Sequence, residues 1–257
     1  MTFLRKARRI MKIKEIYDYL DTIAPFSTAA EWDNCGLSVG SLDIDVDKVL
    51  IALDVTDDVI ETATREGAEL VITHHPLLFN PVAQIETNSL IYKAVKSGVT
   101  FISSHTCLDK AVGGVNDCLA RKVGITALKQ SQVDEFLKIG EIEPCRPEDF
   151  ALKVKNALGG KVSFTHNNAT IKTVALCSGG GGDLIDVSHL EGADALLTGE
   201  AKHHEFLQAN HLGTDLFVAG HYETEVIICE ELCEILSQKF PDIEFILYMG
   251  QAPVKYI

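Results

Sequence analysis

The chain has 257 residues, of which 46% are hydrophobic and 23% are charged, a composition typical of a soluble globular protein. Asp and Glu number 37 against 23 Lys and Arg, which gives a formal net charge of −14 at pH 7. A surface of this sign repels phosphate backbones and argues against nucleic acid as the main partner. No apolar run approaches the roughly 20 residues that a membrane span needs, so we expect no membrane association.

The seven cysteines are scattered along the chain without a C-x-x-C pair, which indicates reduced thiols and predicts a cytoplasmic protein. Residues 1–10 carry four basic side chains but no apolar segment of signal-peptide length. We interpret them as a loose tail or as the product of an upstream start codon, with a targeting segment as the minor alternative.

The first half of the chain predicts alternating helices and strands. A helix is expected over Ile13–Ile23, where the apolar residues have amphipathic spacing, and Pro25 ends it. The following segments predict strands at Val49–Leu53, Leu70–Thr73 and Val99–Ser103, and helices at Asp57–Glu66 and Ser89–Lys96. This alternation is typical of α/β layers.

The second half repeats the alternation. Strands are expected at Lys172–Cys177, Ala195–Thr198, Leu216–Ala219 and Glu244–Tyr248, and helices at Leu184–Leu190, Ala201–Asn210 and Val226–Lys239. Between them, the polar stretch from Ile125 to Arg146 has no strong periodicity. We therefore predict an α/β protein made of two similar domains, residues 11–125 and 126–257.

Local matches between the halves support a duplication. The segment Glu66-Gly-Ala-Glu-Leu-Val-Ile-Thr, which precedes His74-His75, resembles Glu191-Gly-Ala-Asp-Ala-Leu-Leu-Thr, which precedes Gly-Glu-Ala-Lys and His203-His204. Further on, Ser104-His105-x-x-x-Asp109 resembles Gly220-His221-x-x-x-Glu225. Both pairs are offset by similar numbers of residues, and each half would place its histidines just past strand ends, where open α/β sheets bind ligands.

These residues predict a divalent-metal site, with a core of His74, His75, Asp109, His221 and Glu225. Imidazole and carboxylate together suit zinc, iron or manganese, as well as cobalt and nickel. Because adjacent side chains of an extended segment point to opposite sides, we expect His74 and His75 to serve different ions. A carboxylate such as Glu225 can bridge two ions, so the expected centre is dinuclear.

Several other features keep more than one interpretation. His203 and His204 could bond to ligands or only line a helix end, His166 and His189 are taken as surface or structural, and Cys107 as a buried filler rather than a ligand. The Gly-rich loop Ser178–Asp183 could present N–H groups to a phosphate or could be a tight turn. Asn116 is a plausible N-cap that holds the loop after Asp109.

Taken together, the motifs resemble those of the NIF-three-like proteins, also known as GTP cyclohydrolase type-2 homologues. The ordered set is Trp32-Asp-Asn-x-Gly-Leu, Thr73-His-His-Pro, Ser104-His-x-x-Leu-Asp, Gly113-Gly-Val-Asn, Thr198-Gly-Glu with His203-His204, and Gly220-His-Tyr-x-Thr-Glu. The resemblance runs from about Met11 to the C-terminus. It implies two similar α/β domains with a dinuclear metal site in the cleft between them and a toroidal homohexamer, and it assigns ligand roles to the five core residues, with His105 a nearby candidate.

The function expected from the site and the resemblance is a metal-dependent hydrolase that acts on a nucleotide or related heterocycle. Two divalent ions would activate water, Glu225 or a neighbouring histidine would move protons, and the Gly179 to Gly182 loop could hold a phosphate. A protein of another class, a non-enzymatic metal-binding scaffold or regulatory adaptor, would carry the same residues. Turnover of a substrate distinguishes the two.

Overall fold

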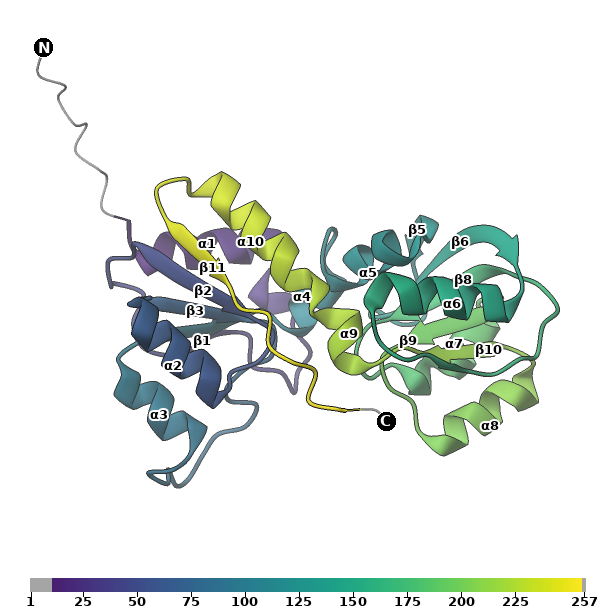
Figure 1. The fold of residues 1–257 in the computed structure, drawn as a ribbon, viewed down its shortest axis with the longest axis horizontal. Coiled ribbons are helices and arrows are strands. Elements are labelled where there is room, and N and C mark those ends of the chain that lie inside the picture. Colours follow the sequence, from purple (N-terminus) through teal and green to yellow (C-terminus); the bar gives the residue numbers. More distant parts are fainter. Residues whose placement is uncertain (1–10, 256–257) are drawn as a thin grey trace, which may run out of the picture. The chain divides into compact units, whose positions relative to one another are not determined.

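The computed structural model describes residues 11–255, so the predicted tail at 1–10 lies outside the described residues. The described chain forms two compact units (Figure 1). Unit 1 comprises residues 11–108 and 228–250, and unit 2 comprises residues 109–227 and 251–255. Among these residues, no helix is long and apolar enough to cross a membrane.

The two units differ from the predicted halves 11–125 and 126–257 in two segments. Helix α5 (Val115–Val123) belongs to unit 2, because Leu119 and Val123 are buried in that unit's core. Strand β11 (Glu244–Leu247) belongs to unit 1, because it pairs with a strand of that sheet. Tertiary pairing of this kind leaves no local mark in the sequence.

Unit 1 is built on a five-stranded sheet. Its order is β1 (Gly36–Val39), β4 (Thr100–Ser103), β3 (Leu70–Thr73), β2 (Lys48–Ala52) and β11. The last four strands are parallel, and β1 runs antiparallel to β4. Strands β2, β3 and β4 are almost wholly buried, as expected of parallel strands that are covered on both faces.

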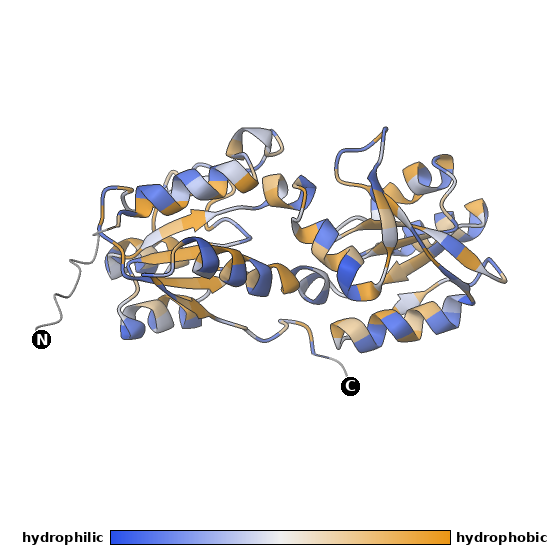
Figure 2. Cartoon of the chain, turned by 90° about the horizontal axis from the view of Figure 1, so that it is seen from above, coloured by the Kyte–Doolittle hydropathy of each residue, from blue (hydrophilic) through white to orange (hydrophobic). Residues whose placement is uncertain are grey.

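Helices cover both faces of this sheet (Figure 1). On one face, α2 (Asp57–Glu66) and α3 (Leu90–Ser97) bury Val59 and Ala94 against Leu50 and Val71. On the other lie α1 (Ile13–Ile23) and α10 (Ile227–Lys239). The hydropathy colouring agrees with this arrangement: the strands are largely hydrophobic, and the helices that cover them are amphipathic (Figure 2).

Unit 2 has a six-stranded sheet. Its order is β5 (Thr126–Gln130), β6 (Lys138–Cys145), β8 (Ile171–Cys177), β9 (Ala195–Thr198), β10 (Asp215–Val218) and β7 (Ser163–Phe164). Strands β8, β9 and β10 are parallel, whereas β5, β6 and β7 are paired antiparallel. The stretch without periodicity between Ile125 and Arg146 therefore contains the β5–β6 pair.

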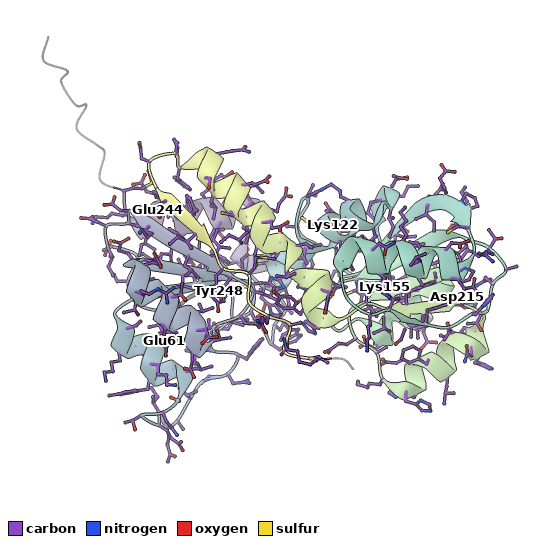
Figure 3. All side chains as sticks on the ribbon, viewed as in Figure 1. Glu61, Lys122, Lys155, Asp215, Glu244 and Tyr248 are labelled. Carbon is purple, nitrogen blue, oxygen red and sulfur yellow. The ribbon has the colours of Figure 1, made fainter. Side chains whose placement is uncertain are left out.

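The helices of unit 2 also lie on both faces of the sheet. Helices α5 and α6 (Pro147–Leu158) pack on one face, and α7 (Ile185–Leu190) and α8 (His203–Leu212) on the other. The outward side of α6 carries the exposed Lys155, as the outward side of α2 in unit 1 carries Glu61 (Figure 3). Short helical segments complete the chain at η1 (Phe26–Thr28), α4 (Thr106–Lys110), η2 (Gly182–Leu184) and α9 (His221–Glu225).

The predicted duplication is visible in the topology. In unit 1 the strands β2, β3 and β4 follow one another through α2 and α3, and in unit 2 the strands β8, β9 and β10 follow one another through α7 and α8. In both units an antiparallel strand, β1 or β7, precedes this series in the chain and pairs with its third strand. The third strands, β4 and β10, each lead into a His-x-x-x-acid motif.

Most element boundaries agree with the sequence prediction. Helices α1 and α2 and strands β3 and β9 have the predicted bounds. The elements β4, β8, α7, α10 and β11 differ by one residue at one end, and β2 and β10 begin and end one residue earlier than predicted. Helix α3 begins one residue later and ends one residue later, with Ser89 as its N-cap. The start and end of α8 are both shifted by two residues, because Ala201 and Lys202 still belong to the loop after β9.

Candidate metal centre

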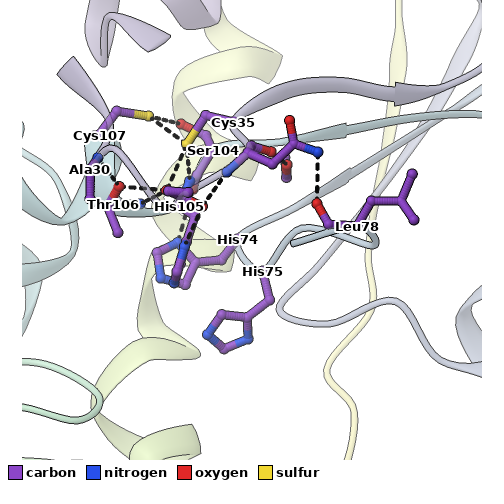
Figure 4. A network of polar contacts seen from close by, with 12 residues as sticks. Ala30, Cys35, His74, His75, Leu78, Ser104, His105, Thr106 and Cys107 are labelled. Carbon is purple, nitrogen blue, oxygen red and sulfur yellow. Dashed lines mark hydrogen bonds and ion pairs between the residues drawn. The ribbon is translucent and has the colours of Figure 1, made fainter. Parts of the chain in front are cut away.

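Unit 1 gathers three imidazoles at the carboxyl ends of two neighbouring parallel strands. His74 and His75 follow β3, and His105 follows β4. The ring centroids lie 4.9 Å apart for His74 and His75, 5.1 Å for His74 and His105, and 5.3 Å for His75 and His105 (Figure 4). One nitrogen of each ring lies within 4.8 Å of the others, a spacing that suits metal binding. His105, a secondary candidate from sequence, is thus a full member of this cluster.

His74 and His75 do not point to opposite sides of a strand, whereas the assignment of the two rings to different ions stays a prediction. Strand β3 ends at Thr73, and His74 and His75 lie in a bend, so the alternation of an extended strand no longer applies. The rings of His74 and His75 are neighbours, and one nitrogen of each lies within 4.8 Å of a nitrogen of His105.

Each imidazole of unit 1 is oriented by a hydrogen bond at Nδ1. The acceptors are the Ser104 carbonyl for His74 at 2.9 Å, the Asp54 carboxylate for His75 at 2.7 Å, and the Asp33 carboxylate for His105 at 3.0 Å. A carbonyl oxygen can only accept, so Nδ1 of His74 carries the proton and Nε2 carries the lone pair. Metal-binding histidines are held in this way, with the second nitrogen bonded to a carbonyl or carboxylate.

The groups around Asp33 keep its carboxylate ionised. Its burial would raise the pKa, but hydrogen bonds from His105 and Thr106 outweigh burial and hold the pKa well below its usual range. The side chain is fully covered, and it also accepts from the Cys35 thiol. A permanent negative charge behind His105 accepts the hydrogen bond from Nδ1 and fixes the orientation of that ring.

Unit 2 contributes two buried carboxylates and one imidazole. Glu225 is 4% exposed and Asp109 is 9% exposed, and a carboxylate oxygen of each lies within 4.8 Å of the other. His221 begins α9 and Glu225 ends it, which brings His221 Nε2 to 3.1 Å from Glu225 Oε2. Glu225 is therefore the common neighbour of the other two donors.

His221 is protonated near neutral pH in the absence of metal. The hydrogen bond to Glu225, together with the smaller effect of Glu200, whose Oε2 lies 3.3 Å from Nδ1, raises the pKa to about 9 against the opposing effect of burial. Because a metal binds only the unprotonated nitrogen, an ion at this position must replace the proton.

The Gly-rich loop makes close backbone contacts. Three of its N–H groups donate inside the protein, from Gly179 to Thr224 Oγ1, from Gly181 to Thr198 Oγ1 and from Gly182 to the Glu200 carbonyl. A Cβ on Gly179, which has a φ of 60°, would lie 2.2 Å from Glu225 Oε1. Of the two interpretations from sequence, the tight turn with close backbone approach is confirmed.

The remaining histidines and Cys107 fall outside the metal-binding groups found among residues 11–255. His203 and His204 are exposed at the start of α8, His166 pairs with Glu148 on the surface, and His189 bonds to Thr214 Oγ1. Cys107 is buried, with its sulfur 3.4 Å from that of Cys35.

The expectation that Asn116 acts as an N-cap is wrong. Helix α5 begins at Val115 with Gly114 as its N-cap, so Asn116 lies inside the helix. Its amide bridges two segments instead, because Oδ1 accepts from the Ser178 N–H and Nδ2 donates to the Phe136 carbonyl. Ser178 Oγ in turn donates to Asp109 at 3.4 Å. Asn116 therefore supports the loop behind Asp109, as its structural interpretation required.

The partners of the imidazoles could not be predicted from the sequence. Asp33 lies in the Trp32-Asp-Asn motif and Glu200 in the Thr198-Gly-Glu motif. The motifs indicated that these positions matter but not that the carboxylates bind histidine nitrogens. Asp54 carried no motif at all. Only the fold brings these carboxylates, 21 to 72 residues away in sequence, to the ring nitrogens.

Unit 2 also contains a cavity of about 790 Å³ with His221 in its wall. Lys161 and Lys202 contribute positive charge, and Glu200, Glu223 and Tyr222 contribute further polar groups. Its volume is within the range of small-molecule sites.

Residues 11–253 match the family model described as Duf34/NIF3 (NGG1p interacting factor 3). A similar relative is the GTP cyclohydrolase 1 type 2 homolog of Clostridium perfringens, 32% identical over 92% of this chain and 96% of that protein. Among solved structures, Staphylococcus aureus protein SA1388 is similar with a TM-score of 0.89 and 28% identity, covering 96% of this chain and 99% of that one. Reduced HcgD from Methanocaldococcus jannaschii is similar with a TM-score of 0.82 and 33% identity, covering 93% and 98%.

Proposed function

Because this chain belongs to the Duf34/NIF3 family, we propose that it is a dinuclear metal-dependent hydrolase that acts on a nucleotide or related heterocycle. The ligands of the two divalent ions are His74, His75, Asp109, His221 and Glu225, with His105 as a sixth donor. The observation that carries the proposal is the gathering of imidazole and carboxylate donors around the His-x-x-x-acid motifs that follow β4 and β10, the third strands of the two repeated series.

The donor chemistry fits the proposed ions. Four imidazoles and two carboxylates form the mixed nitrogen and oxygen set that zinc, iron and manganese prefer. Six donors exceed the four of a single tetrahedral ion, which supports a stoichiometry of two. Glu225 is suited to a shared position because both Asp109 and His221 lie next to it.

Proposed ligands lie close in sequence to the points where the chain passes from one unit to the other. The chain leaves unit 1 between Leu108 and Asp109, so Asp109 is the first residue of unit 2 and follows His105 by only four positions. It returns to unit 1 between Ile227 and Ile228, three residues after Glu225. Proposed ligands thus stand at both of these crossings.

The ions, when bound, supply the Lewis acidity that activates water and polarises the bond under attack. The chain's own residues supply orientation and proton transfer. Glu225 or a neighbouring histidine would take the proton that the attacking water loses, and Glu200, 3.3 Å from His221 Nδ1, would hold the His221 ring from the opposite side. The hydrogen bonds at Nδ1 hold the three imidazoles of unit 1 in position.

Three N–H groups of the Gly-rich loop, those of Gly179, Gly181 and Gly182, are used within the protein, so side chains would supply most contacts to a substrate phosphate. Lys161 and Lys202 line the cavity that has His221 in its wall and would contribute positive charge for this role. Four acidic residues of the same wall oppose it, so a phosphate would add little to binding; they are Asp183, Glu200, Glu205 and Glu223. The relatives named GTP cyclohydrolase 1 type 2 homolog motivate the choice of nucleotides and related heterocycles as first substrates to test.

The test is turnover by metal-loaded protein on a panel of nucleotides, pterins and phosphoesters, with products followed by mass spectrometry. We expect a product that disappears after chelation and in Glu225→Gln, while His189→Gln retains it. Two bound ions without turnover on any member of the panel would contradict hydrolysis and favour the metal-binding scaffold or adaptor.

We further propose that the protein assembles as a homohexamer, which the family resemblance implies. Light scattering gives the mass directly, and the expected value is six times the 28.1 kDa of one chain. A 28.1 kDa species over a wide concentration range would contradict this assembly.

A further inference from the structure

Two large aromatic side chains of unit 1 are held in an exposed position next to the imidazole cluster. Trp32 is 61% exposed and Phe79 is 44% exposed. Both contact the same imidazole edge-on, with ring centroids 5.9 Å from His105 for Trp32 and 5.6 Å for Phe79. We call these two side chains the aromatic platform. Large exposed aromatics beside a candidate centre indicate a binding surface, because a monomer gains stability by burying them.

The backbone next to each aromatic is fixed. Asp33, which follows Trp32, is anchored through its carboxylate to the His105 ring and to the Thr106 backbone. Leu78, which precedes Phe79, accepts a hydrogen bond from Asn34 Nδ2 at 2.7 Å, so the two loops are tied together. The exposure of both rings is therefore part of the folded structure and not the result of a loose loop.

The platform adjoins the donors through a single residue. His105 contacts Trp32 and Phe79, and its ring also lies 5.1 Å from that of His74 and 5.3 Å from that of His75. A planar molecule stacked on the platform would thus lie one imidazole away from the proposed metal ligands.

We propose that Trp32 and Phe79 bind the ring of a planar aromatic heterocycle and hold it beside the imidazole cluster. The inference rests on the proposed function for its link to hydrolysis, and it deepens that function by assigning recognition to the ring of the substrate. Stacking on aromatic side chains accepts any flat π-system, and a base on an aromatic side chain typically contributes about 1–3 kcal/mol.

Charge also favours the ring as the recognised part. The chain carries a net charge of −14, which disfavours the approach of a phosphate, and the N–H groups of Gly179 and Gly181 in the Gly-rich loop are used internally. A neutral nucleoside should therefore bind about as well as its monophosphate, whereas a sugar phosphate that lacks the ring should not bind.

The experiment measures binding of guanosine, guanosine 5′-monophosphate and ribose 5-phosphate by calorimetry to metal-loaded and metal-free protein. Trp32 is the only tryptophan, so its fluorescence reports independently on the platform. We expect both ring-containing ligands to bind and to change this fluorescence, and ribose 5-phosphate to do neither. Trp32→Ala and Phe79→Leu should each weaken guanosine binding by about tenfold, while Trp32→Phe should retain it within a few-fold.

Val82→Ala is the matched control, because Val82 is 46% exposed in the same loop as Phe79. It should leave guanosine affinity unchanged. Metal content, measured on every variant, separates this inference from the proposed function, because platform variants should keep the wild-type content. Equal guanosine affinity in wild type, Trp32→Ala and Phe79→Leu would overturn the inference. So would equal binding of ribose 5-phosphate, or variants that change only the mass in light scattering, which would assign the platform to contacts between copies.

Discussion

The two units place a histidine at the same point of the same topology, yet they surround it differently. His105 follows β4 and His221 follows β10, and each is four residues from an acidic residue, Asp109 or Glu225. The Nδ1 partner of His105 is the fully buried Asp33, whereas the Nδ1 partner of His221 is Glu200, whose side chain is 64% exposed. Duplication preserved the position of the ring but not the environment that controls it.

Because of this difference, we expect the donors of the two units to contribute to metal binding in different ways. Unit 1 offers three rings oriented by hydrogen bonds, so its donors are arranged before any ion arrives. Unit 2 offers carboxylates around a protonated imidazole, so its donors hold a proton that the ion replaces. Preorganisation should therefore govern the metal affinity of unit 1, and proton competition that of unit 2.

The largest expected effect is that of removing the carboxylate shared within unit 2. In Glu225→Gln the side chain loses its charge and an anionic oxygen, so metal content should fall from about two ions per chain to about one or fewer. His189→Gln, on α7 and bonded to Thr214, is the control and should keep both ions. Elemental analysis measures the content, and circular dichroism checks the fold. Equal metal content in Glu225→Gln and wild type would remove Glu225 from the ligands.

The paired substitutions Asp33→Asn and Glu200→Gln test the contrast between the two Nδ1 partners directly. Loss of the charged partner of a ligand histidine typically costs about 10–100-fold in metal affinity. We expect an effect of this size for Asp33→Asn, because Asp33 also anchors Thr106. Glu200→Gln should cost only a few-fold, because solvent screens an exposed pair. Competition with a metal-sensitive dye gives both affinities, and equal losses would show that the two environments are equivalent.

The pH dependence sharpens the contrast further. The pKa of His221 is raised to about 9 in the folded, metal-free protein, so its protonated form stabilises unit 2 fully below about pH 6.5. That stabilisation is lost as pH rises through 9. Metal affinity should change in the opposite direction, rising about tenfold per pH unit between pH 7 and 9 as the competing proton leaves.

Melting curves of chelated protein and dye competition across this pH range measure the two trends. His221→Asn is the control, since it should flatten both. A metal affinity of the wild type that does not vary with pH would contradict competition by this proton.

How far the sequence could predict these features depends on the distance over which each is determined. Helix α2 and strand β3 are predictable to the residue, because their periodicity and caps are local, with Thr56 as N-cap and Gly67 at the C-terminal end. The β5–β6 pair escapes prediction because most of the side chains of β5 are exposed and polar. Its pairing depends on β8, far along the chain.

The candidate site shows the same division. The donors could be predicted because they follow strand ends in a repeated motif, and two of the acidic partners lie in the motifs as well. The orientation of the rings could not, because it depends on contacts such as that between His105 and Asp33. The neighbouring rings of His74 and His75 could not be predicted either, because β3 ends one residue before them.

The smallest expected effect concerns the glycine that gives Glu225 its room. Gly179→Ala should destabilise unit 2 and weaken metal binding, because the new Cβ would meet Glu225 Oε1 at 2.2 Å and His221 Nε2 at 3.2 Å. Gly192→Ala is the matched control in the same unit, since Gly192 also has a positive φ, 77°, but a Cβ there would meet no atom within 4 Å. Both variants incur the backbone cost of an alanine in the left-handed region, about 1 kcal/mol.

Only Gly179→Ala adds the steric conflict, which typically costs about a further 1 kcal/mol. Denaturant unfolding of metal-free protein should therefore separate the two variants by about that amount, and only Gly179→Ala should lower metal affinity. If Gly192→Ala destabilised the protein as much and Gly179→Ala bound metal normally, the close approach of this loop would have no role in shaping the carboxylate donors of unit 2. The contrast between the units would then depend on charge alone.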